Sequence, residues 1–184
     1  MKISIITFGM PPIYNRRVET GEDKGTLIRF MEERGFDFIQ NSITTAGDLD
    51  LVVKKLWENN VKCLIFNLKH WGRNALMVQL ARRMDLPLAL FCHTQNGLSG
   101  VTITTSASGI LREMDFSRNI NLHERFSDKM LDELYSWIRG VCALTQLRES
   151  RVMCWGGSYG AEMSYTRSDA DGIENLLIAE VLVE

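Results

Sequence analysis

The stretch VKCLIFNLKHWGRNALMVQLARRMDLPLALFC, residues 61–92, decides the fold class of this chain. It opens with an apolar run at 61–66, continues as a helical pattern that Asn74 can cap, and returns at Pro87 to an apolar run ending at Cys92. Near-continuous apolar strands joined by a helix are typical of parallel strands buried on both faces. This stretch therefore predicts a β-α-β unit.

The same alternation extends towards the N-terminus. Apolar strands are predicted at 3–8 and 36–40, with a helix at 25–33 that Gly35 ends and a helix that Asp48 or Asp50 caps. The side chains expected on the inner helix faces are Leu27, Phe30 and Met31, then Leu49, Val52, Val53, Leu56 and Trp57, then Ala75, Leu76, Leu80, Ala81 and Met84. We expect an α/β fold: a doubly wound, Rossmann-like or flavodoxin-like parallel sheet with helices on both faces.

The rhythm changes after Cys92. Residues 93–121 are rich in Thr, Ser, Gly and Asn and show no clear period until Gly109–Met114, which predicts a long loop that serves a site or an interface. A helix at 127–147 is predicted to be the longest in the chain. Its apolar stripe, expected in the core, is Met130, Leu131, Leu134, Trp137, Ile138, Val141 and Leu144.

The last part of the chain reads as the start of another α/β unit. The segment RVMCWGGSYG, residues 151–160, predicts a strand followed by a Gly-Gly turn. A helix beginning at Ser168 and Asp169 and a final strand at 178–183 complete a β-α-β pattern. We therefore expect an N-terminal α/β domain over 1–150 and an incomplete second domain over 151–184.

Composition narrows the class of protein. The 184 residues are 45% hydrophobic and 24% charged, with a net charge of -2, which disfavours nucleic acid as a partner. No apolar run approaches the ~20 residues of a membrane span, and the N-terminus does not resemble a signal peptide, so we expect a cytoplasmic protein. Cys63, Cys92, Cys142 and Cys154 occur singly, which favours reduced core residues.

Candidate ligand-binding residues follow the predicted strands. In open α/β sheets ligands bind beyond the carboxyl ends of the strands. The residues placed there are Arg16 and Arg17 after the first strand, Trp71 after the third, and His93 and Gln95 after the fourth. Arginine can donate a fork of hydrogen bonds, and tryptophan offers a flat apolar surface for a sugar ring. This chemistry suits a polar, uncharged small molecule.

Each candidate also has a structural interpretation. The Arg16–Arg17 pair can be solvated, Trp71 can pack onto the core, and His93 can cap a strand end. No dinucleotide GxGxxG motif, Walker loop or nucleophile elbow is present, and the three histidines lack metal-motif spacing. From the residues alone we therefore assign no catalytic residue and no metal ligand to this chain.

The order of these segments resembles a known family. Asn15-Arg16-Arg17, Trp71, His93-Thr94-Gln95, Gly109 with Arg112-Glu113-Met114, and the strand at 151–160 together resemble the N-terminal region of the L-fucose and L-arabinose isomerases. The likeness covers nearly the whole chain but only the first part of such an enzyme.

The resemblance implies a homo-oligomeric aldose–ketose isomerase that uses manganese. Its metal ligands would lie in later domains, so this chain would bind no cofactor itself. The resemblance also implies that Arg16 and Trp71 reach a sugar at a neighbouring subunit's metal site. Two functions stay open: the N-terminal part of an isomerase, and a free-standing, non-catalytic sugar-binding or regulatory module.

Overall fold

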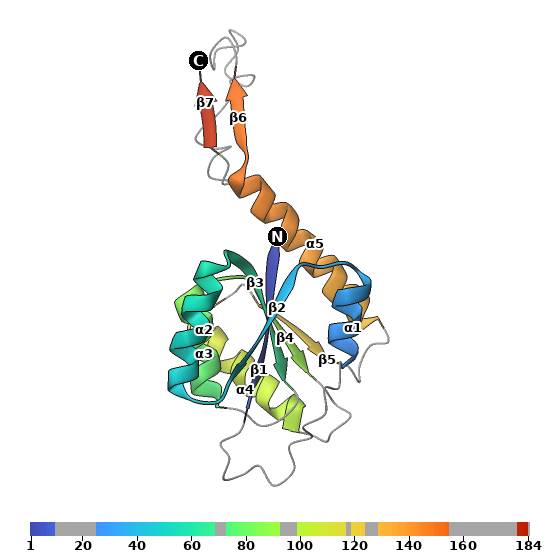
Figure 1. Cartoon of the computed structure of the whole chain (residues 1–184), viewed down its shortest axis with the longest axis vertical. Helices are drawn as coiled ribbons and strands as arrows, with labels where there is room; N and C mark the ends of the chain where they lie inside the picture. Colours follow the sequence, from blue (N-terminus) through green and yellow to red (C-terminus); the bar gives the residue numbers. More distant parts are fainter. Residues whose placement is uncertain are drawn as a thin grey trace. The chain divides into compact units, whose positions relative to one another are not determined.

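Strands and helices alternate along the chain (Figure 1). The structure is a computed structural model that describes residues 1–9, 25–68, 73–92, 99–116, 119–123, 129–154 and 180–183. In chain order the elements are β1 (Lys2–Phe8), α1 (Thr26–Glu33), β2 (Phe38–Ile43), α2 (Ala46–Glu58), β3 (Val61–Leu68), α3 (Asn74–Met84), β4 (Leu88–Cys92), α4 (Ser99–Glu113), β5 (Asn119–His123), α5 (Met130–Glu149), β6 (Arg151–Cys154) and β7 (Glu180–Val183).

The chain divides into two compact units, Met1–Trp137 and Ile138–Glu184. The division falls within α5. The predicted boundary at residue 150 and the incomplete second domain stay predictions.

The first unit is built on a five-stranded sheet with the order β2-β1-β3-β4-β5. Every neighbouring pair of strands is parallel. The α/β fold with a parallel sheet covered by helices is thus confirmed, and the four predicted strands correspond to β1 to β4. The second strand is displaced from the predicted 36–40 to Phe38–Ile43.

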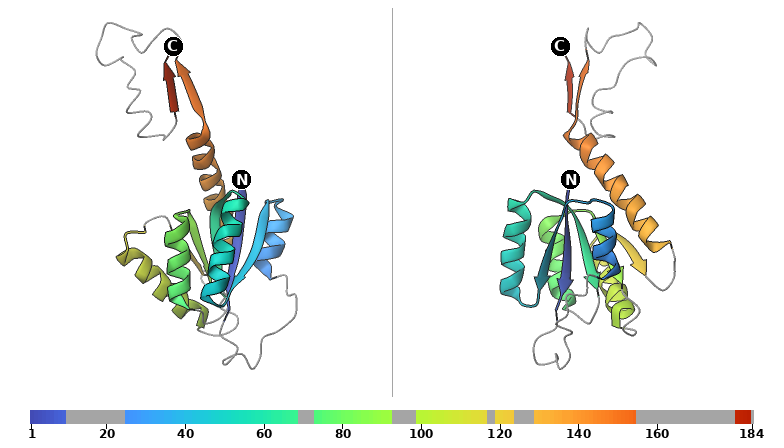
Figure 2. Two further views of the ribbon diagram at one scale, coloured as in Figure 1. Left: turned by 60° about the vertical axis from the view of Figure 1, so that its left-hand side comes forward. Right: turned by 45° about the vertical axis from the view of Figure 1, so that its right-hand side comes forward.

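The side chains of alternate strand residues point to opposite faces of the sheet. Ile6 and Phe8 of β1 share one core cluster with residues of α2, α3 and α4. Ile3 and Ile5 are also buried but lie outside that cluster. Figures 1 and 2 show α1 across the sheet from α2, α3 and α4, so the helices cover both faces.

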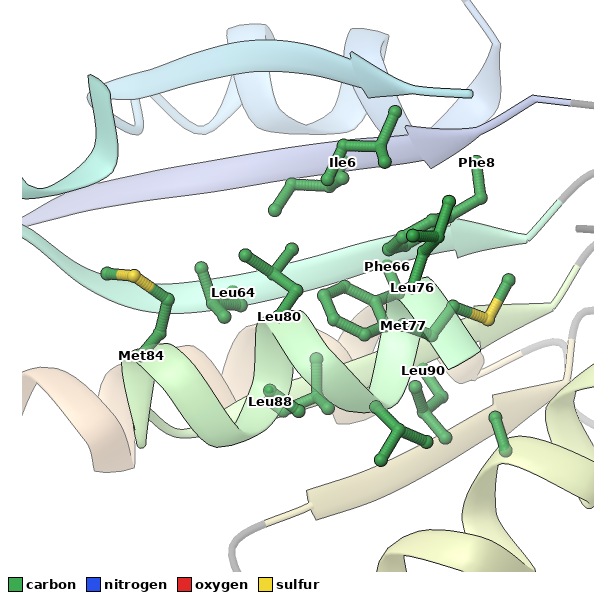
Figure 3. Close-up of a cluster of buried hydrophobic side chains, with 14 of the residues drawn as sticks. Ile6, Phe8, Leu64, Phe66, Leu76, Met77, Leu80, Met84, Leu88 and Leu90 are labelled. Atoms are coloured by element: carbon green, nitrogen blue, oxygen red, sulfur yellow. The ribbon is translucent and has the colours of Figure 1, made fainter. Parts of the chain in front are cut away.

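This core cluster packs α3 onto the middle of the sheet (Figure 3). Phe8 and Phe66 meet edge to face with their ring centroids 4.8 Å apart, an arrangement that aromatic pairs favour. The labelled side chains of α3 that face these strands are Leu76, Met77, Leu80 and Met84. All four are buried, and each contributes on the order of 2 kcal/mol of hydrophobic stabilisation.

A capping box begins α2. The N-cap is Thr45, whose side-chain oxygen accepts a hydrogen bond from the Asp48 N–H, while Asp48 Oδ2 accepts from the Thr45 N–H at 2.8 Å. The expectation that Asp48 or Asp50 is the cap was therefore wrong by a few residues. In the same way α3 has Arg73 as its N-cap, and Asn74 is its first helical residue.

Most of the predicted inner-face residues are buried, with two exceptions. Trp57 is 62% exposed and Ala75 is exposed, so both were assigned to the wrong face. Trp57 lies one helical position after Leu56, which is buried. The buried stripe of α2 is centred on Leu49 and Leu56, and at about 100° per residue Trp57 falls at the solvent edge of that stripe.

The predicted loop over 93–121 is wrong in its main part, because it contains α4 and β5. Ile103, Ala107 and Leu111 recur every four residues and are fully buried, so packing overrides the weak helix propensity of Thr, Ser and Gly. Two threonine hydroxyls donate hydrogen bonds to backbone carbonyls of the same helix. Thr104 Oγ1 donates to the Gly100 carbonyl, and Thr105 Oγ1 donates to the Val101 carbonyl.

The longest described helix is α5, as predicted, although it begins at Met130 rather than at 127. Met130 and Leu134 of its stripe are buried, whereas Leu144 is 39% exposed. In the second unit, β6 and β7 pair in parallel from Arg151 opposite Glu180 to Cys154 opposite Val183. The helix predicted from Ser168 and Asp169 lies outside the described residues.

The capping box gives a first testable prediction. Replacing Thr45 by Ala removes the acceptor for the Asp48 N–H, and we expect the free energy of unfolding to fall by about 1 kcal/mol. Urea denaturation at neutral pH measures this change. Thr105→Ala, which removes a hydroxyl from an exposed position inside α4, is the control. A loss no larger than that of the control would contradict the role of the cap.

The same box makes stability depend on pH. Hydrogen bonds from the Thr44 N–H and then the Thr45 N–H lower the pKa of the Asp48 carboxyl below its usual 3.8. A lowered folded-state pKa means that this stabilisation is complete above 3.8 and is lost as the pH falls through the folded value. We therefore expect the stability difference between the wild type and Asp48→Asn to shrink on acidification. Denaturation curves measured from neutral pH down to about pH 2.5 test this, and a constant difference would contradict it.

Candidate functional site

The sheet has one topological switch point. From β1 the chain passes to β2 on one side, and from β2 it crosses to β3 on the other side of β1. In open α/β sheets, ligands bind outside the carboxyl ends of the strands at such a reversal of order. The candidate site is therefore the carboxyl edge of the sheet around β1 and β3 (Figure 1).

The strand register brings the carboxyl ends of all five strands to this edge. Phe8, the last residue of β1, lies opposite Ile43, the last residue of β2. The ends of β3, β4 and β5 are also level, because Leu68 pairs with Cys92 and Cys92 pairs with His123. The segments that follow these strands consequently start from the same side of the molecule.

All five residues predicted from the sequence to bind a ligand lie outside the described residues. They are Arg16, Arg17, Trp71, His93 and Gln95. The strands that precede them are described. Arg16 and Arg17 follow β1 and Trp71 follows β3, which are the two strands that flank the switch point. His93 and Gln95 follow β4, the next strand of the sheet.

Three polar residues form a row across the sheet at the switch point. Thr7 of β1 is the register partner of Ser42 on β2 and of Asn67 on β3. The Asn67 Nδ2 donates a long hydrogen bond, 3.5 Å, to Thr7 Oγ1. Two residues earlier on the same strands the corresponding residues are Gln40, Ile5 and Ile65. On the central strands β1 and β3, the face that carries Thr7 and Asn67 is therefore apolar two residues earlier and polar near the carboxyl edge.

Asn67 is the most deeply buried member of this row, with 4% of its surface exposed. Burying an amide is unfavourable unless it is hydrogen-bonded, whereas an apolar side chain would fit the neighbouring Ile65 and Phe91 without that requirement. The sequence contained the signal for this residue. The apolar run predicts a strand that ends at Phe66 and leaves Asn67 after it, whereas β3 continues to Leu68.

Gly9, which directly follows β1, lies close to the end of β2. The Gly9 N–H donates to the Ile43 carbonyl at 2.9 Å, which extends the pairing of β1 with β2 by one residue. A Cβ atom at Gly9 would lie 2.5 Å from Thr44 Oγ1. A larger side chain at this position therefore requires the Thr44 hydroxyl to move.

A second polar contact lies where α3 begins. Asn74 Nδ2 donates to Ser106 Oγ of α4 at 2.7 Å. The Asn74 Oδ1 is buried and has no hydrogen-bond partner in the part of the chain that the structure describes. This contact ties the first residue of α3 to the middle of α4.

The row at the strand ends carries only hydroxyl and carboxamide groups. Within the described ranges, no three His, Cys, Asp or Glu side chains gather to hold a metal ion. No helix among those residues is long and apolar enough to cross a membrane. The described chemistry therefore suits hydrogen bonding to a neutral polar ligand.

Comparison with known proteins adds no family assignment. No known protein family matches the sequence, and no curated protein matches it. Any functional assignment therefore depends on the chemistry of the site and on the resemblance of its segments.

The contact between Gly9 and Thr44 yields a prediction. We expect Gly9→Ala to lower the free energy of unfolding by about 1–2 kcal/mol, because the new methyl group overlaps Thr44 Oγ1. In the double variant Gly9→Ala/Thr44→Ala the close oxygen is gone, and we expect most of the loss to be recovered. Thermal and urea denaturation of the two single variants and the double variant measure this coupling.

Gly109 provides the matched control. It lies in α4, and no atom lies within 4 Å of a Cβ built there, so Gly109→Ala should raise stability slightly through helix propensity. If Gly9→Ala behaves like Gly109→Ala, the end of β1 does not require glycine.

Proposed function

We propose that this chain is the N-terminal, sugar-binding part of an aldose–ketose isomerase. The sugar would bind at the carboxyl edge of the sheet, between the ends of β1 and β3. Arg16 and Arg17 would donate hydrogen bonds to its hydroxyl groups, and Trp71 would cover one face of the ring. His93 and Gln95 would contribute from the end of β4. In a homo-oligomer these side chains would act together with a neighbouring subunit.

One observation supports this proposal most strongly. The segments that contain Arg16–Arg17 and Trp71 follow the two strands that flank the switch point. Near the carboxyl ends of those strands, Thr7 and Asn67 form a pair of neutral hydrogen-bonding groups. A sugar offers many hydroxyl groups and an apolar ring face, which match this combination. The family resemblance of the same segments supports the isomerase assignment.

The proposal gives this chain no part in holding the metal. Manganese in proteins is bound mainly by carboxylate oxygens and imidazole, and the described residues gather no such set. The manganese ion and the catalytic side chains of the isomerase would belong to other sequence. This chain would supply substrate contacts and a subunit interface.

A free-standing sugar-binding or regulatory module is the alternative. The observation in its favour is that the sheet of the first unit is covered by helices on both faces and has a core cluster of its own. A module of this kind would bind sugar without any catalytic partner. The length of the native polypeptide, measured by mass spectrometry on protein from the source cells, separates the two functions. A polypeptide several hundred residues longer favours the isomerase, and one of 184 residues favours the module.

Sugar binding and catalysis can be tested on the same purified chain. We expect L-fucose or L-arabinose to shift backbone amide resonances near the ends of β1 and β3, with a dissociation constant on the order of 1 mM. With manganese added, we expect no ketose to form, because the reaction needs residues outside this chain. Absence of any sugar-dependent shift would contradict the binding function. Ketose formation by a preparation free of other isomerases would contradict the proposal that the catalytic residues lie outside this chain.

Two variants test the proposed contacts. Arg16→Ala and Trp71→Ala should each weaken sugar binding by about 1–3 kcal/mol, through lost hydrogen bonds or a lost ring contact, and leave the melting temperature nearly unchanged. His93→Ala should have a smaller effect if this side chain only caps the strand. A large drop in melting temperature for Trp71→Ala with unchanged affinity would assign Trp71 to the core instead.

A further inference from the structure

A polar pair at the switch point provides a specific contact for the ligand. We propose that Thr7 is a specificity-determining residue that donates a hydrogen bond to an oxygen atom of a neutral sugar, and that Asn67 is the positioning residue that orients its hydroxyl. This inference rests on the proposed sugar-binding function and adds two residues that the sequence interpretation did not assign.

The direction of the hydrogen bond is the first step. The Asn67 carboxamide nitrogen donates to Thr7 Oγ1, so the Thr7 oxygen is occupied as an acceptor. A hydroxyl group has one hydrogen to donate as well as its acceptor sites. In the part of the chain that the structure describes, no side-chain hydrogen bond from Thr7 to a protein acceptor is present. Since none of the described residues accepts the Thr7 hydroxyl hydrogen, the proposal assigns that hydrogen to a ligand oxygen.

The position of the pair is the second step. Thr7 is only one residue before the end of β1, and its register partner Asn67 is one residue before the end of β3. Thr7 is partly exposed, whereas Asn67 is almost fully buried. A buried amide that donates to a partly exposed hydroxyl beside it favours the orientations in which that hydroxyl accepts from the amide, and a restricted hydroxyl loses less entropy on binding.

The neighbouring strand supports the same ligand class. Ser42 of β2 is the register partner of Thr7 and is exposed, so a second neutral hydroxyl lies beside the first. Uncharged donors discriminate a hydroxyl-bearing ligand from one that lacks the hydroxyl, because the unpaired groups then lose their hydrogen bonds. The row is therefore suited to a sugar hydroxyl group or carbonyl oxygen.

The molecule contains a matched polar pair on the other face of the sheet, because Ser4 and Thr7 are an odd number of residues apart on β1. Asn41 Nδ2 donates to Ser4 Oγ at 3.0 Å, which again joins an amide to a hydroxyl between β1 and β2. Ser4 is fully buried near the amino end of β1. Ser4→Ala thus removes a comparable hydroxyl without touching the proposed contact.

Titration of the 184-residue chain and three variants with L-fucose and L-arabinose, followed by amide chemical shifts, tests the inference. We expect Thr7→Val, which keeps the shape and removes the hydroxyl, to weaken binding about 10-fold. Thr7→Ser, which restores the hydroxyl, should lie within about twofold of the wild type, and Ser4→Ala should bind as the wild type does. Melting temperatures of all four proteins separate lost affinity from lost fold.

The outcomes separate failure of the proposed role of Thr7 from failure of the proposed sugar-binding function. If the wild type binds neither sugar, the proposed sugar-binding function fails and this inference fails with it. If the wild type binds and Thr7→Val binds equally well, only the role of Thr7 is overturned. Should Thr7→Val not fold, the wild-type titration still decides, because sugar-dependent shifts that spare the amides of Thr7 and Asn67 overturn the inference.

Discussion

The pairing of β1 with both β2 and β3 is the constraint on which the rest of the structure depends. Because β1 lies between its two partners, the chain must reverse direction across the sheet after β2. That reversal leaves helices on both faces and creates the switch point. It also requires the central strands to be apolar on both sides, since each face is covered. Ile3, Ile5 and Ile6 of β1 and Leu64, Ile65 and Phe66 of β3 are accordingly almost fully buried.

The sequence predicts this sheet well because a strand that is buried on both faces has a continuous apolar sequence, which is easy to recognise. The ends of the helices and the existence of α4 are harder to predict from the sequence. The cap of α2 depends on a reciprocal bond between Thr45 and Asp48, so the acidic residue alone placed the start too late. In α4 the residues Thr104 and Thr105 favour other conformations by local propensity. Only the packing of Ile103, Ala107 and Leu111 makes the segment helical, and such packing is set by residues far away in the sequence.

The candidate site was predictable in part for a related reason. Sequence order alone places Arg16, Arg17 and Trp71 after strands, and the observed strand order assigns those strands to the two sides of the switch point. The pairing of Thr7 with Asn67 could not be found in this way. Their relation exists only through the register that puts them opposite each other, and register is a property of two strands together.

A buried amide–hydroxyl pair is not by itself a functional feature, as Ser4 and Asn41 demonstrate. Their bond measures 3.0 Å and lies on the other face of the sheet from Thr7, where each group has a hydrogen-bond partner. The Thr7–Asn67 bond is longer, at 3.5 Å, and joins the two strands whose ends flank the switch point. A valine and a leucine at these two positions would pack among Ile5, Ile65 and Phe91 with no hydrogen bond to satisfy. Stability alone therefore does not require polarity at this level of the sheet, and the proposed contact with a neutral, oxygen-rich ligand would account for it.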